Sequence, residues 1–100
     1  MDTLHVLNKS IAAGIAVESC CKAIHKGDSL ILIEDGVYNA TGVIHPMLAK
    51  VLDANTPVYA READIVTRGL NDRIISEVQL VSDSDWVELC VASAPIVSWY

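Results

Sequence analysis

The sequence predicts an α/β protein: a mostly parallel sheet of about five strands with helices on both faces, a three-layer fold. Short apolar runs of strand length alternate along the chain with segments of helical periodicity. The run at residues 29–33 has the continuous apolar character of a central strand that is covered on both faces. Parallel neighbours need crossover connections, which the helical segments supply. With 100 residues, the chain has the size of one domain, spanning residues 1–100.

The first half of the pattern begins with a strand at residues 3–7. The polar residues 8–10 suit a loop and a helix N-cap, and a helix is expected at residues 11–25, with Gly27 as its stop. Apolar side chains recur at helical spacing within that helix, at Ala13, Val17, Cys20 and Ile24. The central strand at residues 29–33 follows.

An acidic turn, residues 34–36, ends the central strand. It lies at the carboxyl end of that strand, where open α/β sheets place their sites. Residues 37–39 and 47–53 then read as helical, with Thr41-Gly42 and His45-Pro46 as breaks between them.

The second half repeats the alternation of strand and helix. Gly69 closes a short helix, Ser82 begins a helix with a capping signal, and Pro95 prevents that helix from continuing. The expected elements are strands at residues 57–60, 78–81 and 96–99 and helices at residues 61–68 and 82–93.

Composition excludes several classes of function. A formal charge of −6 would repel a phosphate backbone, so direct nucleic-acid binding is not expected. No apolar run approaches the length of a membrane helix, and the start lacks the pattern of a secretory signal. Three cysteines, two of them adjacent and none in a C-x-x-C pair, argue against a disulfide framework and a zinc site. We expect a cytoplasmic protein without a metal or cofactor.

The polar residues give no strong sign of an active site. The usual nucleotide-binding and serine-hydrolase motifs are absent from the sequence. Glu34 and Asp35 could bind a metal in principle, but a solvated turn is the better interpretation. His5, His25 and His45 match no ligand spacing, and we interpret each as structural or exposed, although His5 could face a neighbouring strand.

The cysteines are more informative, because a thiolate is the nucleophile and carrier in persulfide chemistry. Cys20 and Cys21 lie on either side of the apolar stripe of their helix, so periodicity does not decide which is accessible. Buried, inert thiols are the favoured interpretation on physical grounds alone. Cys90 is expected to be the most securely buried of the three.

The pattern as a whole resembles the DsrH/TusB family. The segments that carry the resemblance are Leu4-His5-Val6-Leu7-Asn8-Lys9-Ser10, Gly27-Asp28, Leu30-Ile31-Leu32-Ile33-Glu34-Asp35-Gly36-Val37, Val58-Tyr59-Ala60 with Asp64, Arg68-Gly69-Leu70, and Trp99. The sequence departs from the family at residues 11–13 and 82–86. These departures weaken any choice between the two pathways in which the family acts, sulfur oxidation and transfer-RNA thiolation.

The resemblance implies a DsrE-like fold and a sulfur-relay subunit. Such a subunit assembles with two homologous DsrE/DsrF (TusD/TusC)-like partners into a heterohexamer, and exchanges sulfur with upstream and downstream carrier proteins. The complex would act either in sulfur oxidation or in 2-thiouridine synthesis on transfer RNA. The resemblance also places Cys20 at the family's first-helix cysteine, as a candidate persulfide carrier rather than the centre of a stand-alone enzyme.

Two alternatives stay open at this point. The chain could be a non-catalytic, structural subunit of that complex, or an unrelated small α/β binding module. Accessibility of Cys20 discriminates the first from the carrier hypothesis, because a carrier thiol must be exposed near a cation or a helix N-terminus.

Overall fold

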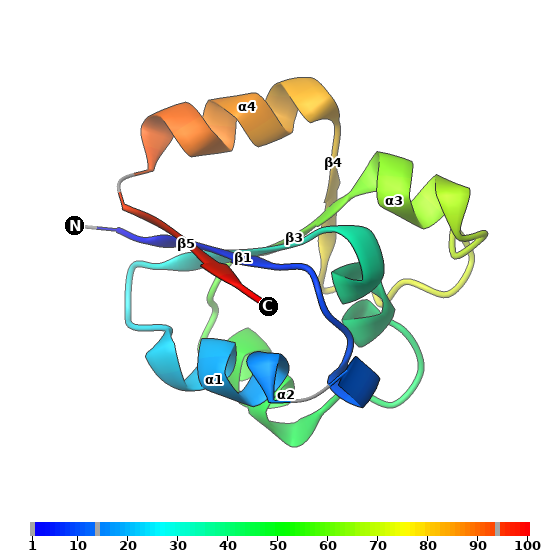
Figure 1. The fold of residues 1–100 in the computed structure, drawn as a ribbon, viewed down its shortest axis with the longest axis horizontal. Helices are drawn as coiled ribbons and strands as arrows, with labels where there is room; N and C mark the ends of the chain where they lie inside the picture. Colours follow the sequence, from blue (N-terminus) through cyan, green and yellow to red (C-terminus); the bar gives the residue numbers. More distant parts are fainter. Residues whose placement is uncertain (1, 14, 94) are drawn as a thin grey trace.

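The computed structural model describes residues 2–13, 15–93 and 95–100, and its centre is one parallel sheet (Figure 1). The strands are β1 (Leu4–Leu7), β2 (Ser29–Leu32), β3 (Val58–Arg61), β4 (Gln79–Val81) and β5 (Ile96–Trp99). The α-helices are α1 (Ala16–Ala23), α2 (Pro46–Asp53), α3 (Glu62–Thr67) and α4 (Asp83–Ala92), and the 3-10 helices are η1 (Ile11–Ala13) and η2 (Glu34–Ala40). Among the described residues, none of the helices is long and apolar enough to cross a membrane.

The five strands follow the order β4-β3-β2-β1-β5, and every neighbouring pair is parallel. The predicted α/β class is therefore confirmed, and β2 is the central strand, as its apolar run indicated. The chain moves outward from β1 to β4 and then returns to place β5 on the other side of β1. Leu4 consequently lies opposite both Ser29 of β2 and Ile96 of β5.

Helices cover both faces of the sheet, as predicted. α1 and α2 pack on one face and α4 lies over the other (Figure 1). Alternation along the strands explains the two layers, because successive side chains of a strand point to opposite faces. In β1, Leu7 belongs to the large cluster under α1 and α2, whereas Leu4 and Val6 belong to the smaller cluster under α4.

Two helix boundaries differ from the sequence prediction. The expected helix at residues 11–25 is a 3-10 turn, η1, followed by the shorter helix α1; residue 14, the glycine between them, lies outside the described residues. α1 ends at Ala23 because Ile24 is already extended, with ψ 127°.

The predicted helix at residues 47–53 is α2. The break predicted before it, at His45-Pro46, is where α2 begins. Pro46 lacks an N–H and suits the first turn of a helix, and Nδ1 of His45 accepts a hydrogen bond from the N–H of Met47 at 3.1 Å.

Candidate functional site

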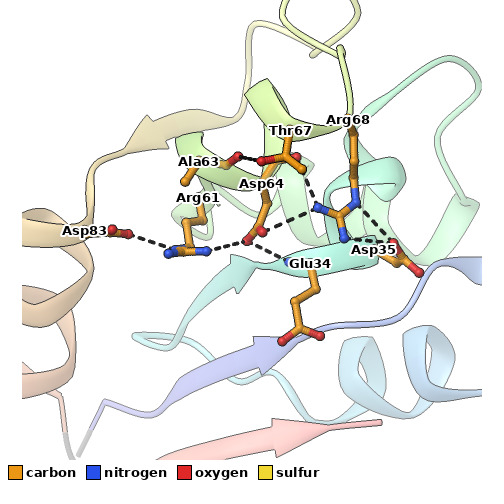
Figure 2. Close-up of polar contacts among 8 residues, drawn as sticks. All are labelled: Glu34, Asp35, Arg61, Ala63, Asp64, Thr67, Arg68 and Asp83. Atoms are coloured by element: carbon orange, nitrogen blue, oxygen red, sulfur yellow. Dashed lines mark hydrogen bonds and ion pairs between the residues drawn. The ribbon is translucent and has the colours of Figure 1, made fainter.

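A network of charged side chains lies at the carboxyl edge of the sheet, where β2 and β3 end (Figure 2). Asp64 of α3 is its centre. Its Oδ2 accepts a hydrogen bond from the backbone N–H of Glu34 at 2.8 Å and one from Nη1 of Arg61 at 3.3 Å. Nη1 of Arg68 lies 3.4 Å from the other oxygen, Oδ1. One carboxylate thus connects the loop after β2 to β3 and to both ends of α3.

Each arginine also pairs with a second carboxylate at the surface. Nε of Arg61 donates to Oδ1 of Asp83 at 2.8 Å, and Nη2 of Arg68 lies 3.0 Å from Oδ1 of Asp35. Hydrogen bonds to Asp83 and then to Asp64 raise the pKa of the Arg61 guanidinium. Every charged group in the arrangement has an oppositely charged partner, so it is suited to holding the loop rather than to attacking a substrate.

The loop held by this network has an unusual backbone. Glu34 has a φ of 50°, in the left-handed region that non-glycine residues seldom adopt. Two residues later the chain passes so close to β1 that a Cβ on Gly36 would lie 2.1 Å from the backbone oxygen of Leu7. The bond from Asp64 to the N–H of Glu34 fixes this turn, and the Glu34 side chain points away from the network (Figure 2).

The acidic turn is therefore ion-paired at Asp35 and solvated at Glu34. Among the residues the structure describes, no three His, Cys, Asp or Glu side chains come together in a way that could hold a metal ion. The turn lies at the carboxyl edge of the sheet, as the sequence predicts, but its pairing with Arg68 was not predicted. The spacing of Arg61 and Arg68, three residues before and four after Asp64, was the available signal, because residues three and four apart are neighbours on a helical turn.

Cys20, the candidate persulfide carrier, lies in the hydrophobic core and is not part of this network. Its side chain is 0% exposed and packs in the cluster between α1, α2 and the sheet. Burial, and secondarily the neighbouring Cys21, raise the pKa of the Cys20 thiol to about 12. In this conformation the sulfur is protonated and sealed from a donor protein.

The other two cysteines reverse the expected order of burial. Burial raises the pKa of Cys21 to about 11. Cys90 was expected to be the most buried, and this was wrong, because it is half-buried while Cys20 and Cys21 are buried. The reason is that α4 contains no buried residue and rests on the sheet through partly exposed side chains, namely Trp86, Leu89 and Cys90.

The three histidines all have structural contacts. His5 is buried between Asp28 and Trp99 in hydrogen-bonding distance of both, which agrees with its expected position facing a neighbour. His45 caps α2 and lies 3.7 Å from a carboxylate oxygen of Glu18. The backbone N–H of His25 donates to Asp28 at 2.9 Å.

Comparison with known proteins relates the chain to one family. The family model described as "DsrH like protein" matches residues 9–95. The chain is 33% identical over 96 residues to Protein TusB of Salmonella paratyphi B, covering 96% of this chain and 99% of the relative. It is 30% identical over 86 residues to Protein TusB of Pectobacterium carotovorum, covering 83% of this chain and 86% of the relative.

Solved structures support the fold. The ychN protein of E. coli superposes with a TM-score of 0.79 at 13% identity, covering 98% of this chain and 99% of that protein. A protein of unknown function from Methanobacterium thermoautotrophicum, MTH1491, superposes with a TM-score of 0.70 at 11% identity, covering 97% and 96%. At these identities the likeness concerns the fold alone.

Proposed function

Because this chain belongs to the DsrH family and is similar to TusB proteins, we propose that it is a structural subunit of a cytoplasmic sulfur-relay complex of the DsrEFH/TusBCD type. Its partners in this proposal are two homologous DsrE/DsrF (TusD/TusC)-like subunits. The complex passes persulfide sulfur between upstream and downstream carriers, for sulfur oxidation or for transfer-RNA thiolation. The family match over residues 9–95 is the observation that carries the proposal.

Burial of Cys20 supports the structural role over the carrier role. A persulfide is passed on when a thiolate attacks the outer sulfur of the donor, and the donor leaves as a thiolate. A fully buried thiol with a pKa of about 12 is not ionised at neutral pH and cannot reach that sulfur. The reactive cysteine is therefore assigned to a partner subunit, and Cys20 could act as a carrier only if α1 moved off the sheet.

Exposed apolar side chains support a role in assembly. On α4, Val87 and Val91 are one turn apart and are 58% and 83% exposed. Leu80 on β4 and Ile96 on β5 are also exposed, on the two outermost strands of the sheet. Apolar groups that remain exposed in a small protein often mark an interface. With a net charge of −6, the chain is not expected to bind RNA by itself.

The test is to assemble the complex and locate the sulfur. The chain is co-expressed with its two homologous partners, and the assembly is measured by size-exclusion chromatography with light scattering. The purified complex is then incubated with a charged persulfide donor, and each subunit is weighed by intact-protein mass spectrometry. We expect a stable complex in which a partner gains sulfur and this chain does not.

Cysteine variants separate the structural role from the carrier role. Cys20→Ser, Cys21→Ser and Cys90→Ser complexes are loaded side by side, and sulfur on the partner should be the same in all three. If this chain gains a sulfur atom that Cys20→Ser alone removes, Cys20 is the carrier and the structural role is wrong. If the chain remains a monomer in the presence of both partners, the proposed membership of the complex is wrong.

A further inference from the structure

A cavity of about 740 Å³ opens at the edge of the sheet opposite the charged network. It lies between the ends of α1 and α2 and the starts of β2 and β3, since its lining runs from Cys21 to Asp28 and from Met47 to Pro57. Its volume falls within the range of roughly 300–1,000 Å³ that is usual for small-molecule sites. It is about twice the volume of a second cavity, of about 370 Å³, which lies beside β4 and α4.

The walls of the cavity are largely apolar. The apolar lining residues are Cys21, Ile24, Met47, Val51, Ala54 and Pro57. Cys21 and Val51 also belong to the core cluster, so this wall is continuous with the interior of the protein and is held in place by it. A wall of this kind favours a ligand with an apolar body.

The mouth of the cavity carries two lysines, Lys26 and Lys50, both exposed. Among the described residues neither takes part in an ion pair. The carboxylate of Asp28 also lines the cavity, but it already accepts hydrogen bonds from the N–H groups of Thr3 and His25 and lies 3.0 Å from Nε2 of His5. Its oxygens are thus already engaged in hydrogen bonds within the protein, and Lys26 and Lys50 are the two lysines that line the cavity.

We propose that this cavity binds a small organic anion, with an apolar body against the Ile24, Met47 and Val51 wall and a carboxylate or sulfonate between Lys26 and Lys50. The two lysines stand out because the chain as a whole carries a charge of −6. This site is independent of the sulfur-relay role, in which Cys21, one of its lining residues, serves only as a control.

A different explanation for the lysines is helix stabilisation. A cation near the C-terminus of a helix interacts favourably with the helix dipole, and Lys50 lies in the last turn of α2. Lys22 likewise lies in the last turn of its helix, α1, is exposed, and does not line the cavity. Lys22→Gln is therefore the matched control: it changes the charge at a helix end and leaves the cavity unaltered.

The test uses three probes and the full chain. Octanoate has an apolar body and a charge, octanol has the body alone, and acetate has the charge alone. Binding is followed by ¹H–¹⁵N NMR titration, which also locates the site. We expect octanoate to shift amides of residues 24–28 and 50–57 and to bind about tenfold more tightly than octanol, with acetate producing no saturable shift.

Variants complete the test. The double variant Lys26→Gln/Lys50→Gln should weaken octanoate roughly tenfold, since exposed ion pairs contribute a few-fold each, and should leave octanol unchanged. Lys22→Gln should bind octanoate as the wild type does, and melting temperatures confirm that all variants are folded. Equal affinity for octanoate and octanol, equal octanoate binding by the double variant, shifts confined to α4, or no binding by any probe would each overturn the proposal.

Discussion

The indole Nε1 of Trp99 donates a hydrogen bond to Nδ1 of His5 across 3.1 Å, and the two rings stack with centroids 6.2 Å apart. An indole nitrogen can only donate, so Nδ1 must accept and the imidazole proton must lie on Nε2. Nε2 then donates to Oδ2 of Asp28 at 3.0 Å. The three side chains join β5 to β1 and β1 to the residue that precedes β2.

Trp99→Phe should lower the free energy of unfolding by about 1 kcal/mol, because it keeps an aromatic ring against His5 but removes the N–H donor. The acceptor on His5 is then left buried without its partner. Urea denaturation measures the change. Trp86→Phe is the control, since Trp86 is half-buried and makes no indole hydrogen bond among the described residues. Equal losses for the two variants would show that only apolar contact matters.

Stability should fall with acid through Asp28. Burial alone would raise the pKa of this carboxyl, but hydrogen bonds from the N–H of His25, the imidazole of His5 and the N–H of Thr3 lower it from 3.8 to about 2. Because the folded pKa lies below the unfolded value, the contribution is complete above about pH 4 and is lost as the pH falls toward 2.

The Asp28→Asn protein should be less stable than the wild type at neutral pH. Between pH 4 and pH 2, its melting temperature should fall by less than that of the wild type. Thermal unfolding at a series of pH values tests this. Asp72→Asn, at an exposed carboxylate, should follow the wild-type curve. If the melting temperature of Asp28→Asn falls with pH as steeply as that of the wild type, other groups cause the acid sensitivity.

Asp64→Ala should cost about 2 kcal/mol of unfolding free energy, because it strips a nearly buried carboxylate from two arginines and from the N–H of Glu34. Asp83→Ala removes a single, exposed partner of Arg61 and should cost less than about 1 kcal/mol. Chemical denaturation of both variants gives the comparison. Similar small losses would mean that the network is not what holds the loop after β2.

Gly36→Ala should prevent stable folding or cost more than about 3 kcal/mol, because the added Cβ would meet backbone that cannot move aside. Gly69→Ala is the contrast. There φ is +66° and nothing lies within 4 Å of the new Cβ, so only the left-handed conformation is penalised, by about 1 kcal/mol. Circular dichroism and denaturation distinguish the two, and a well-folded Gly36→Ala protein would contradict the predicted steric clash.

Thiol labelling should follow exposure in the isolated chain. At pH 8, iodoacetamide should modify Cys90 first, because it is half-buried, whereas burial and raised pKa values protect Cys20 and Cys21. Peptide mass spectrometry over a time course identifies the order. Labelling of Cys20 ahead of Cys90 would reveal that α1 opens readily, and would favour the carrier role.

Local sequence signals were sufficient for most of the fold. The apolar run at residues 29–33 identified the central strand, and the Ser82 capping signal identified the start of α4, where Ser82 and Asp85 bond reciprocally. The break at His45-Pro46 likewise identified the start of α2 to within one residue, because a proline suits the first turn of a helix.

The site was less predictable because its contacts join distant residues. Asp64 meets the N–H of Glu34, 30 positions earlier, and Trp99 meets His5, 94 positions earlier. No periodicity encodes such pairs. The burial of Cys90 was overestimated for a related reason: its apolar neighbours on α4 are distributed around the whole helix, so the local pattern gives no inward face.

The position of β5 next to β1 also predicts an order of folding. Strands β1, β2 and β3 are neighbours both along the chain and in the sheet, so each can pair soon after the helix between them forms. Pairing Leu4 with Ile96 instead closes a loop that contains nearly the whole chain, at a greater cost in chain entropy. Until that late step, one side of β1 is an open edge that can recruit foreign strands, so aggregation during synthesis should depend on how quickly β5 docks.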